Sequence, residues 1–167
     1  QVFAIGADDV YLDGYTSGDI ITASFDNASA GQNKNVMIAG LALGGDEAKN
    51  YTLAGSLLGN ITPRQLTISG VDAQDRVYNG SASIVLTGTA ALAAGTDGGV
   101  VGSDNVTLVT AGAVGVMADK HAGTSKLVTI TGYTLTGTAA ANYTVQQPIG
   151  VDVDIAQKAL TVTGITA

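Results

Sequence analysis

Apolar and polar residues alternate along much of this chain with a period of two. The clearest case is Val151–Ile155, where two aspartates separate three apolar residues. Such alternation is typical of a strand with one buried face and one solvated face. Short runs rich in Val, Ile, Leu and Thr predict further strands at 2–5, 10–12, 19–25, 36–43, 51–58, 65–70, 76–78, 83–87, 106–110, 113–117, 126–131, 133–136 and 143–145. The pattern therefore predicts an all-β protein.

The segments between these runs predict turns and loops. Asn79-Gly80 is a tight-turn dipeptide, so residues 76–78 and 83–87 are expected to form a hairpin. The polar segment 27–35 and the Gly-rich segment 93–104 predict loops. Only residues 46–50 and 90–94 favour a helix, each of about one turn.

The chain contains an internal repeat. Residues 122–145 align without a gap to residues 30–53, at an offset of 92, and 12 of 24 positions are identical. Residues 154–167 align to 60–73 at an offset of 94, and 104–108 align more weakly to 8–12. A period of this length corresponds to one small β domain per repeat.

The repeat divides the chain into three parts. Pro63 cannot donate a ladder hydrogen bond, so it suits a junction between units. We expect an incomplete first repeat at 1–62, a complete second repeat at 63–156, and the opening strand of a third at 157–167.

The expected fold is a tandem array of small immunoglobulin-like β-sandwiches. Tyr51 and Tyr143 each follow a Gly- or Ala-rich turn and begin a predicted strand. Immunoglobulin-like folds often place a corner tyrosine there, and its hydroxyl caps nearby backbone. A β-grasp-like module is the alternative, although the sequence lacks the long helix of that fold.

Charge and composition exclude several functions. The formal net charge is −7 and only seven basic residues are present, which argues against nucleic acid or an anionic bilayer as partner. No apolar run approaches the roughly 20 residues needed to cross a membrane, so no membrane insertion is expected. The chain has no cysteine, which excludes disulfides and thiolate metal sites.

Several motifs occur in an order that resembles a known family. The first motif, at 64–88, is RQLTISGVDAQDRVYNGSASIVLTG. It is followed by DNVTL at 104–108, by ADKHAGTSKLVTITGYTLTGTAAANYTV at 118–145, and by VDIAQKALTVTG at 153–164. This succession resembles the YDG-type repeat of large bacterial exoproteins of the filamentous-haemagglutinin and adhesin kind. The naming motif appears as Tyr78-Asn79-Gly80, with Asn in place of Asp. The resemblance implies a secreted or surface-held, non-enzymatic β module repeated along a stalk.

The residues show no constellation typical of an enzyme. His121, beside Asp119 and Lys120, is the only histidine, and no nucleophile motif accompanies it. Gly95–Gly102 lacks the lysine and the following helix of a phosphate-binding loop, so it is interpreted as a hairpin loop. We expect no catalytic or metal site and no cofactor. Calcium is the inorganic alternative, with oxygen ligands from Asp8, Asp9, Asp13, Asp97 and Asp104.

Six of the eight asparagines begin an N-x-Ser/Thr sequon, which marks a glycosylation site when the residue is exposed and a transferase is present. These candidates are Asn27, Asn50, Asn60, Asn79, Asn105 and Asn142.

Two functions follow. The first is a structural stalk or fibre repeat at a cell surface, whose partners are neighbouring repeats or copies of the chain. The alternative is a module that binds host or matrix glycans, for which Tyr11, Tyr15 and Tyr133 are the candidate aromatics. The first repeat lacks its opening strand, so strand exchange between chains is also predicted, through Lys158, Ala159, Leu160, Thr161, Val162 and Thr163.

Overall fold

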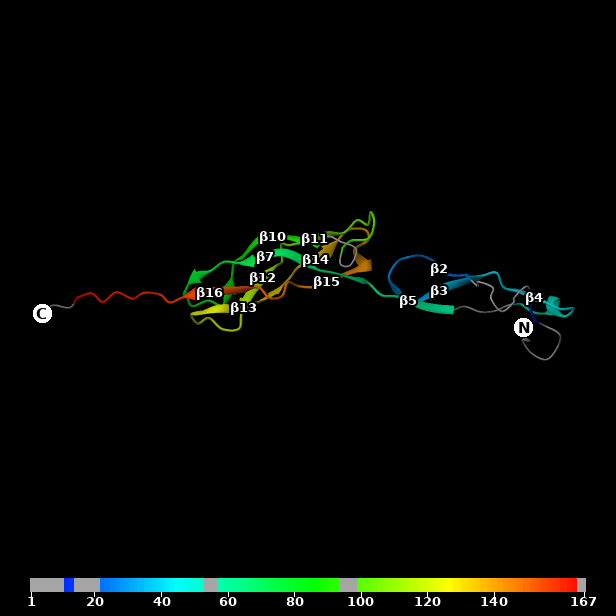
Figure 1. Ribbon diagram of the computed structural model, residues 1–167, viewed down its shortest axis with the longest axis horizontal. Helices are drawn as coiled ribbons and strands as arrows, with labels where there is room; N and C mark the ends of the chain where they lie inside the picture. The colour runs from blue at the N-terminus through cyan, green and yellow to red at the C-terminus, as the bar shows by residue number, and fades with distance from the viewer. Residues whose placement is uncertain (1–10, 14–21, 53–56, 94–98, 165–167) are drawn as a thin grey trace. The chain divides into compact units, whose positions relative to one another are not determined.

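The computed structural model describes residues 11–13, 22–52, 57–93 and 99–164 (Figure 1). The chain divides into two compact units, Gln1–Thr62 and Pro63–Ala167, which we call unit 1 and unit 2. Both units are built from strands, and two single-turn 3-10 helices are the only helical elements in the described parts. No described helix is long and apolar enough to span a bilayer.

Unit 1 is organised around one long strand. Its elements are β1 (Tyr11–Asp13), β2 (Thr22–Phe25), β3 (Gly31–Ala39), β4 (Ala42–Gly44), the 3-10 helix η1 (Ala48–Asn50) and β5 (Leu57–Ile61). β3 lies between β2 and β5 and is antiparallel to both, while β1 and β4 form a separate antiparallel pair. Gly40, with φ of 90°, separates β3 from β4, because a left-handed residue cannot continue a strand.

Unit 2 contains the remaining strands and one 3-10 helix. They are β6 (Arg64–Leu66), β7 (Ile68–Ala73), β8 (Arg76–Val77), β9 (Ser83–Ile84), β10 (Leu86–Leu92), β11 (Thr107–Val109), β12 (Val114–Met117), β13 (Gly123–Thr131), β14 (Thr134–Thr136), η2 (Ala140–Asn142), β15 (Tyr143–Val145) and β16 (Asp152–Ala156).

The largest sheet of unit 2 has five strands in the order β8-β16-β13-β12-β9. Its pairs are antiparallel except β16 with β8, which run parallel. Three two-stranded pairs complete the unit: β7 with β10 and β11 with β14 are antiparallel, and β6 with β15 is parallel.

The core of unit 2 lies between the five-stranded sheet and the β7–β10 pair. The sheet contributes six buried apolar side chains, Ile84, Met117, Val128, Ile130, Val153 and Ile155. Partly buried Ile68, Val71 and Leu86 pack against them from the other side. Figure 1 shows β7 and β10 along one side of the unit and β12, β13 and β16 along the other. Unit 2 is therefore an all-β structure in which the β7–β10 pair packs against the five-stranded sheet.

The strand pairs of unit 1 recur in unit 2 at offsets of 92 to 96 residues. Thr22 pairs with Ala39, and Val114 pairs with Thr131 in the same way. β1 pairs with β4 as β11 pairs with β14. The register shift in β3 between Gly31 and Lys34 recurs in β13 between Gly123 and Lys126.

One backbone irregularity explains this shared shift. Asn33 and Ser125 are the only non-glycine residues with positive φ in the described parts, at 52° and 46°. The backbone N–H of Asn33 donates to Asn60 Oδ1 (2.9 Å), and that of Ser125 donates to Asp154 Oδ1 (2.7 Å). A side-chain acceptor on the next strand thus satisfies the N–H that the bulge removes from the ladder.

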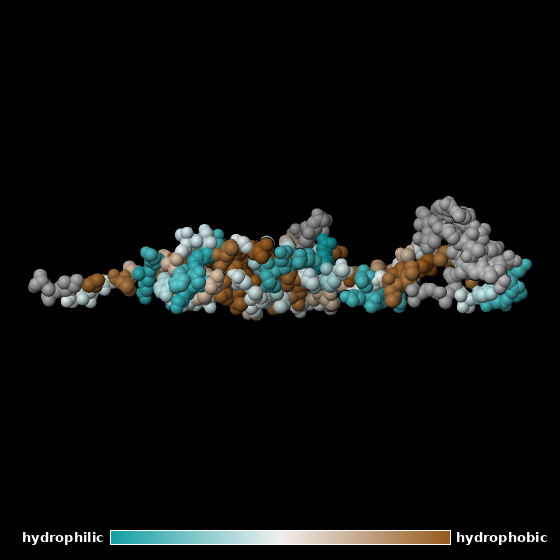
Figure 2. Space-filling model, turned by 90° about the horizontal axis from the view of Figure 1, so that it is seen from below, coloured by the Kyte–Doolittle hydropathy of each residue, from teal (hydrophilic) through white to brown (hydrophobic). Residues whose placement is uncertain are grey.

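The two units differ in how deeply equivalent side chains are buried. Ile38 is 37% exposed and Ile130 only 3%. Tyr51 is 51% exposed and Tyr143 only 7%. The described part of unit 1 has no equivalents of β6 to β10, which include the β7–β10 pair that packs against the sheet in unit 2. Figure 2 shows apolar surface over β2, β3 and β5 of unit 1.

The all-β prediction is confirmed, and so are two of its local features. In β16, Val153 and Ile155 are 1% and 2% exposed, whereas Asp152 and Asp154 are exposed, as the alternation predicts. The helical turn expected within 46–50 is η1.

The hairpin predicted around Asn79-Gly80 is wrong. β8 pairs with β16 and β9 pairs with β12, so the two arms lie at opposite edges of the five-stranded sheet. Sequence proximity favours a hairpin, but β8 pairs with residues 79 positions further along the chain, and β9 pairs with residues 31 to 33 positions further along. The strands on either side of these two, β7 and β10, pair with each other.

Two other local predictions are also wrong. Residues 31–35, predicted as loop, form the first half of β3, because their backbone pairs with β5 while most of their polar side chains face solvent. Residues 90–92, predicted as helix, belong to β10, where pairing with β7 overrides the helix propensity of alanine. Residues 158–163 have no strand partner among the described residues, and their role as the opening strand of a third repeat stays a prediction.

Candidate functional site

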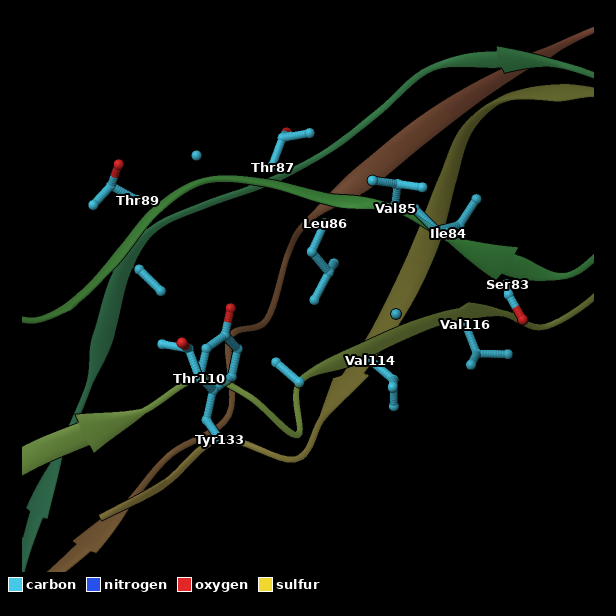
Figure 3. Close-up of a pocket in the computed structure, with 14 residues that line it drawn as sticks. Ser83, Ile84, Val85, Leu86, Thr87, Thr89, Thr110, Val114, Val116 and Tyr133 are labelled. Carbon is cyan, nitrogen blue, oxygen red and sulfur yellow. The ribbon is translucent and has the colours of Figure 1, made fainter. Parts of the chain in front are cut away.

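A groove of about 770 Å³ opens in unit 2 between β10 and β12 (Figure 3). The segment that contains β9 and β10 pairs with β12 at one end, through β9, and diverges from β12 beyond that point. In Figure 3, Leu86 reaches into the space between these two segments, and Val85 lies on the other side of its ribbon. Val85 is accordingly 62% exposed, whereas Leu86 packs against the core.

The polar side chains of the groove are all hydroxyls. They belong to Ser83, Thr87, Thr89, Thr110 and Tyr133, and no carboxylate, amide or basic side chain lines the groove. Its side chains therefore offer apolar contacts and hydroxyl hydrogen bonds to a bound group.

Tyr143 forms the best-defined polar contact inside unit 2. Its hydroxyl accepts a hydrogen bond from the backbone N–H of Val101 (3.0 Å) and donates one to Asp104 Oδ2 (2.7 Å). The hydrogen bond to the Asp104 carboxylate raises the pKa of Tyr143, and burial acts in the same direction. The prediction that this hydroxyl caps nearby backbone is confirmed. The contact ties β15 to the segment before β11.

The Tyr78-Asn79-Gly80 motif forms a turn at the end of β8. Asn79 Oδ1 accepts hydrogen bonds from the Ser81 N–H (3.0 Å) and from the Arg76 guanidinium. The same guanidinium donates to the Ser81 carbonyl, and the Tyr78 N–H donates to the Ala156 carbonyl (2.8 Å). Gly80 has φ of 83°, which favours glycine. The motif therefore holds β8 against β16 and presents no reactive group.

The Asn-Tyr pairs of the repeat end the two 3-10 helices. The N–H of Asn50 donates to the Glu47 carbonyl and that of Asn142 to the Ala139 carbonyl, both at 2.9 Å. Tyr51 and Tyr143 follow in extended conformation. The structure thus places the motif at equivalent positions in both units.

All six sequon asparagines lie in the described residues. Asn27, Asn50, Asn60, Asn79 and Asn105 are exposed, and Asn142 is half-buried. The side chains of Asn27, Asn60 and Asn79 each accept a backbone N–H. Exposure is compatible with modification, and glycosylation of these residues stays a prediction.

The segment around His121 is held by local contacts. Asp119 accepts a hydrogen bond from the His121 N–H (2.8 Å) and forms a 2.6 Å ion pair with Lys126. The hydrogen bond from Lys126 lowers the pKa of Asp119. Asn27 accepts equivalent hydrogen bonds from the Ser29 N–H and from Lys34 in unit 1. This constellation therefore shapes a turn in both units.

Only two of the five calcium candidates lie in the described residues, so this site stays a prediction. Asp104 contacts Tyr143 and Asp13 lies in β1, whereas Asp8, Asp9 and Asp97 lie outside the described residues. Within the described residues, no group of three His, Asp or Glu side chains is arranged to hold a metal ion. Residues 95–98 of the Gly-rich segment also lie outside them, and the rest of that segment forms no strand.

The aromatic residues proposed for glycan binding do not form a described surface. Tyr133 is 5% exposed and belongs to the core of unit 2. Tyr15 lies outside the described residues, as does the side chain of Tyr11.

Two contacts escaped the sequence analysis. The Gln147 side chain accepts a hydrogen bond from the Tyr133 N–H (3.0 Å) and donates one to the Tyr133 carbonyl (2.9 Å). It thus makes the two backbone hydrogen bonds that a neighbouring strand would make. Asp75 Oδ1 accepts the Asp154 N–H (2.7 Å), which ties β16 to the residue before β8. Neither has a sequence signal, because the partners are 14 and 79 residues apart.

The paired strands and the turns that connect them define a small all-β module. The sequence model of the YDG domain family matches residues 3–57 and 62–150. Most of the chain is covered, so the chain belongs to the YDG domain family. No curated protein and no solved structure matches it.

Proposed function

We propose that this chain is a non-catalytic structural repeat of a secreted or surface-held bacterial stalk or fibre. The observation that carries the proposal is the path of the chain through unit 2. The first strand, β6, pairs with β15 at one end of the unit, and the last strand, β16, lies at the other end (Figure 1). Because the chain enters the unit at one end and leaves it at the other, each unit adds its whole length to a stalk.

The last strand is held on both sides. β16 pairs with β13 at Lys126 and Leu127, and with β8 at Arg76 and Val77. Tension on Ala156 acts along β16 and loads these pairings together, in shear. The buried side chains of Val153 and Ile155 would also have to leave the core.

The first strand is paired on one side, with β15. β6 runs parallel to β15, and the Gln146 N–H donates to the Leu66 carbonyl (2.8 Å). Leu66 is completely buried. Tension at the two ends of unit 2 therefore pulls on two strands that are each locked laterally, which is the arrangement a load-bearing link needs.

We further propose that the two units are copies of one repeating sandwich module. The shared strand pairs at an offset of 92, the shared bulge and the two segments matched by the family support this proposal. The two layers that enclose the core support the sandwich architecture. The extracellular location rests on the resemblance to exoprotein repeats, and neighbouring repeats or copies of the chain are the proposed partners.

Single-molecule force spectroscopy tests the load-bearing role. The chain is held between two handle domains, and unit 2 is identified by about 340 Å of contour length from residues 63–156. The control pulls from a cysteine at Lys120→Cys, in the exposed loop between β12 and β13, against the N-terminal handle. We expect a higher unfolding force along the natural axis, because there the pairings of β16 are loaded in shear.

Tyr78→Pro sharpens the test by removing the N–H that donates to Ala156. We expect this variant to lower the unfolding force along the natural axis and to leave the unfolding force along the control axis almost unchanged. The loss of thermodynamic stability is measured separately, so that its effect on both forces can be subtracted. Equal forces along both axes would refute the load-bearing role. Selective binding of the chain on a glycan array would instead favour the glycan-binding alternative.

A further inference from the structure

One edge of β10 is unpaired and forms a wall of the groove in unit 2. β10 pairs with β7 along its other edge, and no described strand pairs with it on the groove side. The Gln74 N–H donates to the Val85 carbonyl (3.0 Å), whereas Ile84 pairs with Gly115 on the β12 side. Backbone groups alternate in direction along a strand, so Leu86 directs its N–H and C=O groups toward the groove.

This edge lacks most of the features that protect an unpaired strand. Such edges are commonly short, or carry charged residues or proline. β8 and β9, at the two edges of the five-stranded sheet, are each two residues long. β10 is seven residues long, and its sequence, LTGTAAL, contains neither a charged residue nor a proline. Its register shift lies between Gly88 and Ala91, so the residues up to Gly88 can accept a further strand in regular pairing.

The charge distribution favours a second copy of the same chain as the partner. The chain has a formal net charge of −7, which in general keeps two copies apart. None of the 14 residues that line the groove is charged. Val85, Val114 and Val116 lie along it and are 62%, 53% and 41% exposed (Figure 3). Two copies can therefore meet here without bringing like charges together, and a charged partner would find no opposite charge.

We propose that the free edge of β10 pairs with the same edge of a second copy, antiparallel and about a two-fold axis at Thr87. The axis follows from the extent of the regular edge, because Ile84 is already paired with Gly115 and the register shift follows Gly88. Leu86 of each copy then forms backbone hydrogen bonds with Gly88 of the other. The two copies of Thr87 oppose each other as a non-hydrogen-bonded pair, with their side chains on the exposed face.

This pairing goes beyond the proposed function, because it joins two stalks side by side and does not extend either of them. The β7–β10 pairs of the two copies become one four-stranded sheet, and the opening of the groove is covered. Since the paired strands are antiparallel, the two chains point in opposite directions. This arrangement suits stalks that project from two facing surfaces.

A single cysteine at the axis tests the register. The chain has no cysteine, and Thr87 is exposed, so Thr87→Cys places one thiol at the surface. Opposed residues of a non-hydrogen-bonded pair have Cα atoms about 4.5 Å apart, which a disulfide spans. The matched control is Thr89→Cys at another exposed threonine of β10. Its two thiols would be four residues apart along the strands, or about 13 Å, which is too far for a disulfide.

Each variant is oxidised over a range of protein concentrations and separated by size under non-reducing conditions. We expect Thr87→Cys to form disulfide-linked dimers about tenfold faster than Thr89→Cys, because only the first pair of thiols lies within bonding distance. The rate for Thr87→Cys should increase with protein concentration.

Sedimentation velocity tests the association without a crosslink. We expect the parent chain to shift from monomer to dimer as its concentration increases. Thr87→Lys sets two lysines opposite each other and should weaken dimerisation about tenfold. Asp72 pairs with Thr87 within one chain, so a lysine there is compatible with the monomer. Thr144→Lys adds the same charge at an exposed residue of β15, outside the groove, and should leave dimerisation unchanged.

Three results would each overturn the inference: equal oxidation rates for the two cysteine variants, a chain that stays monomeric at every concentration, or dimers that are insensitive to Thr87→Lys. A monomeric chain that binds an uncharged, extended peptide in the groove would also overturn it, by assigning the edge to another partner. The force measurement loads contacts within one copy of unit 2. A chain that resists force but stays monomeric therefore keeps the proposed stalk function and loses this lateral partner.

Discussion

The two copies of the opening-strand sequence allow a stability test with an internal control. Leu66 is completely buried beside β15, whereas its equivalent Leu160 is 88% exposed. Replacing each by alanine removes the same atoms from nearly the same local sequence. Any difference between the two variants therefore reports the tertiary environment.

The buried site sets the size of the expected effect. Leu66→Ala loses the transfer free energy of the side chain and leaves a cavity, at a cost of about 2–5 kcal/mol. For a domain of this size, 2 kcal/mol lowers the midpoint of thermal unfolding by roughly 8 °C or more. Leu160→Ala, measured at a concentration where the chain is monomeric, should change stability by less than about 0.5 kcal/mol.

Urea denaturation followed by far-ultraviolet circular dichroism measures both variants. An unchanged dependence of the unfolding free energy on urea would show that the denatured state is unaffected. The reasoning fails if Leu66→Ala stays within 0.5 kcal/mol of the parent chain. It also fails if the two variants lose equal stability in the monomer, because exposure would then not govern the cost.

Two further predictions concern backbone conformation and alkaline stability. Gly132 has φ of 95°, and a Cβ there would lie 1.9 Å from the Gly112 carbonyl oxygen, so Gly132→Ala should destabilise unit 2 by at least about 2 kcal/mol in urea denaturation. Gly80→Ala, with φ of 83° and open space around the Cβ, should cost only about 1–2 kcal/mol, and equal losses would contradict the steric argument. The raised pKa of Tyr143 means that its contribution to stability is complete below the unfolded-state pKa near 10 and is lost as the pH rises through the higher folded-state pKa. Thermal melts between pH 8 and 11 should show a steeper alkaline loss for the parent chain than for Tyr143→Phe, and parallel curves would exclude the hydrogen bond to Asp104 as the cause.

Features carried by neighbouring residues could be predicted from the sequence. The alternation of Val151–Ile155 predicts a strand with one buried face, because side chains in a strand point to alternate faces. The helical turn within 46–50 and the role of the Tyr143 hydroxyl also follow from local composition and position. The offset of 92 predicts which residues of the two units are equivalent, and the shared strand pairs agree with it.

The choice of strand partners could not be predicted in this way. Asn79-Gly80 suggests a hairpin, yet Arg76 and Val77 pair with Ile155 and Ala156 near the end of unit 2. Alternation identifies the buried face of a strand but says nothing of the strand beside it, because strand pairing is set by the whole sheet. The Gln147–Tyr133 contact escaped prediction for the same reason.

The sequence by itself determined the all-β class and the buried face of strands such as 152–156, since these depend on the alternation of side chains along a strand. Only the tertiary structure decided that the first and last strands of unit 2 are locked laterally at its two ends. It also decided which copy of an equivalent residue is buried, as Leu66 and Leu160 illustrate. Burial depends on contacts with segments that are distant in the chain, so a similar local sequence is covered in one place and exposed in another.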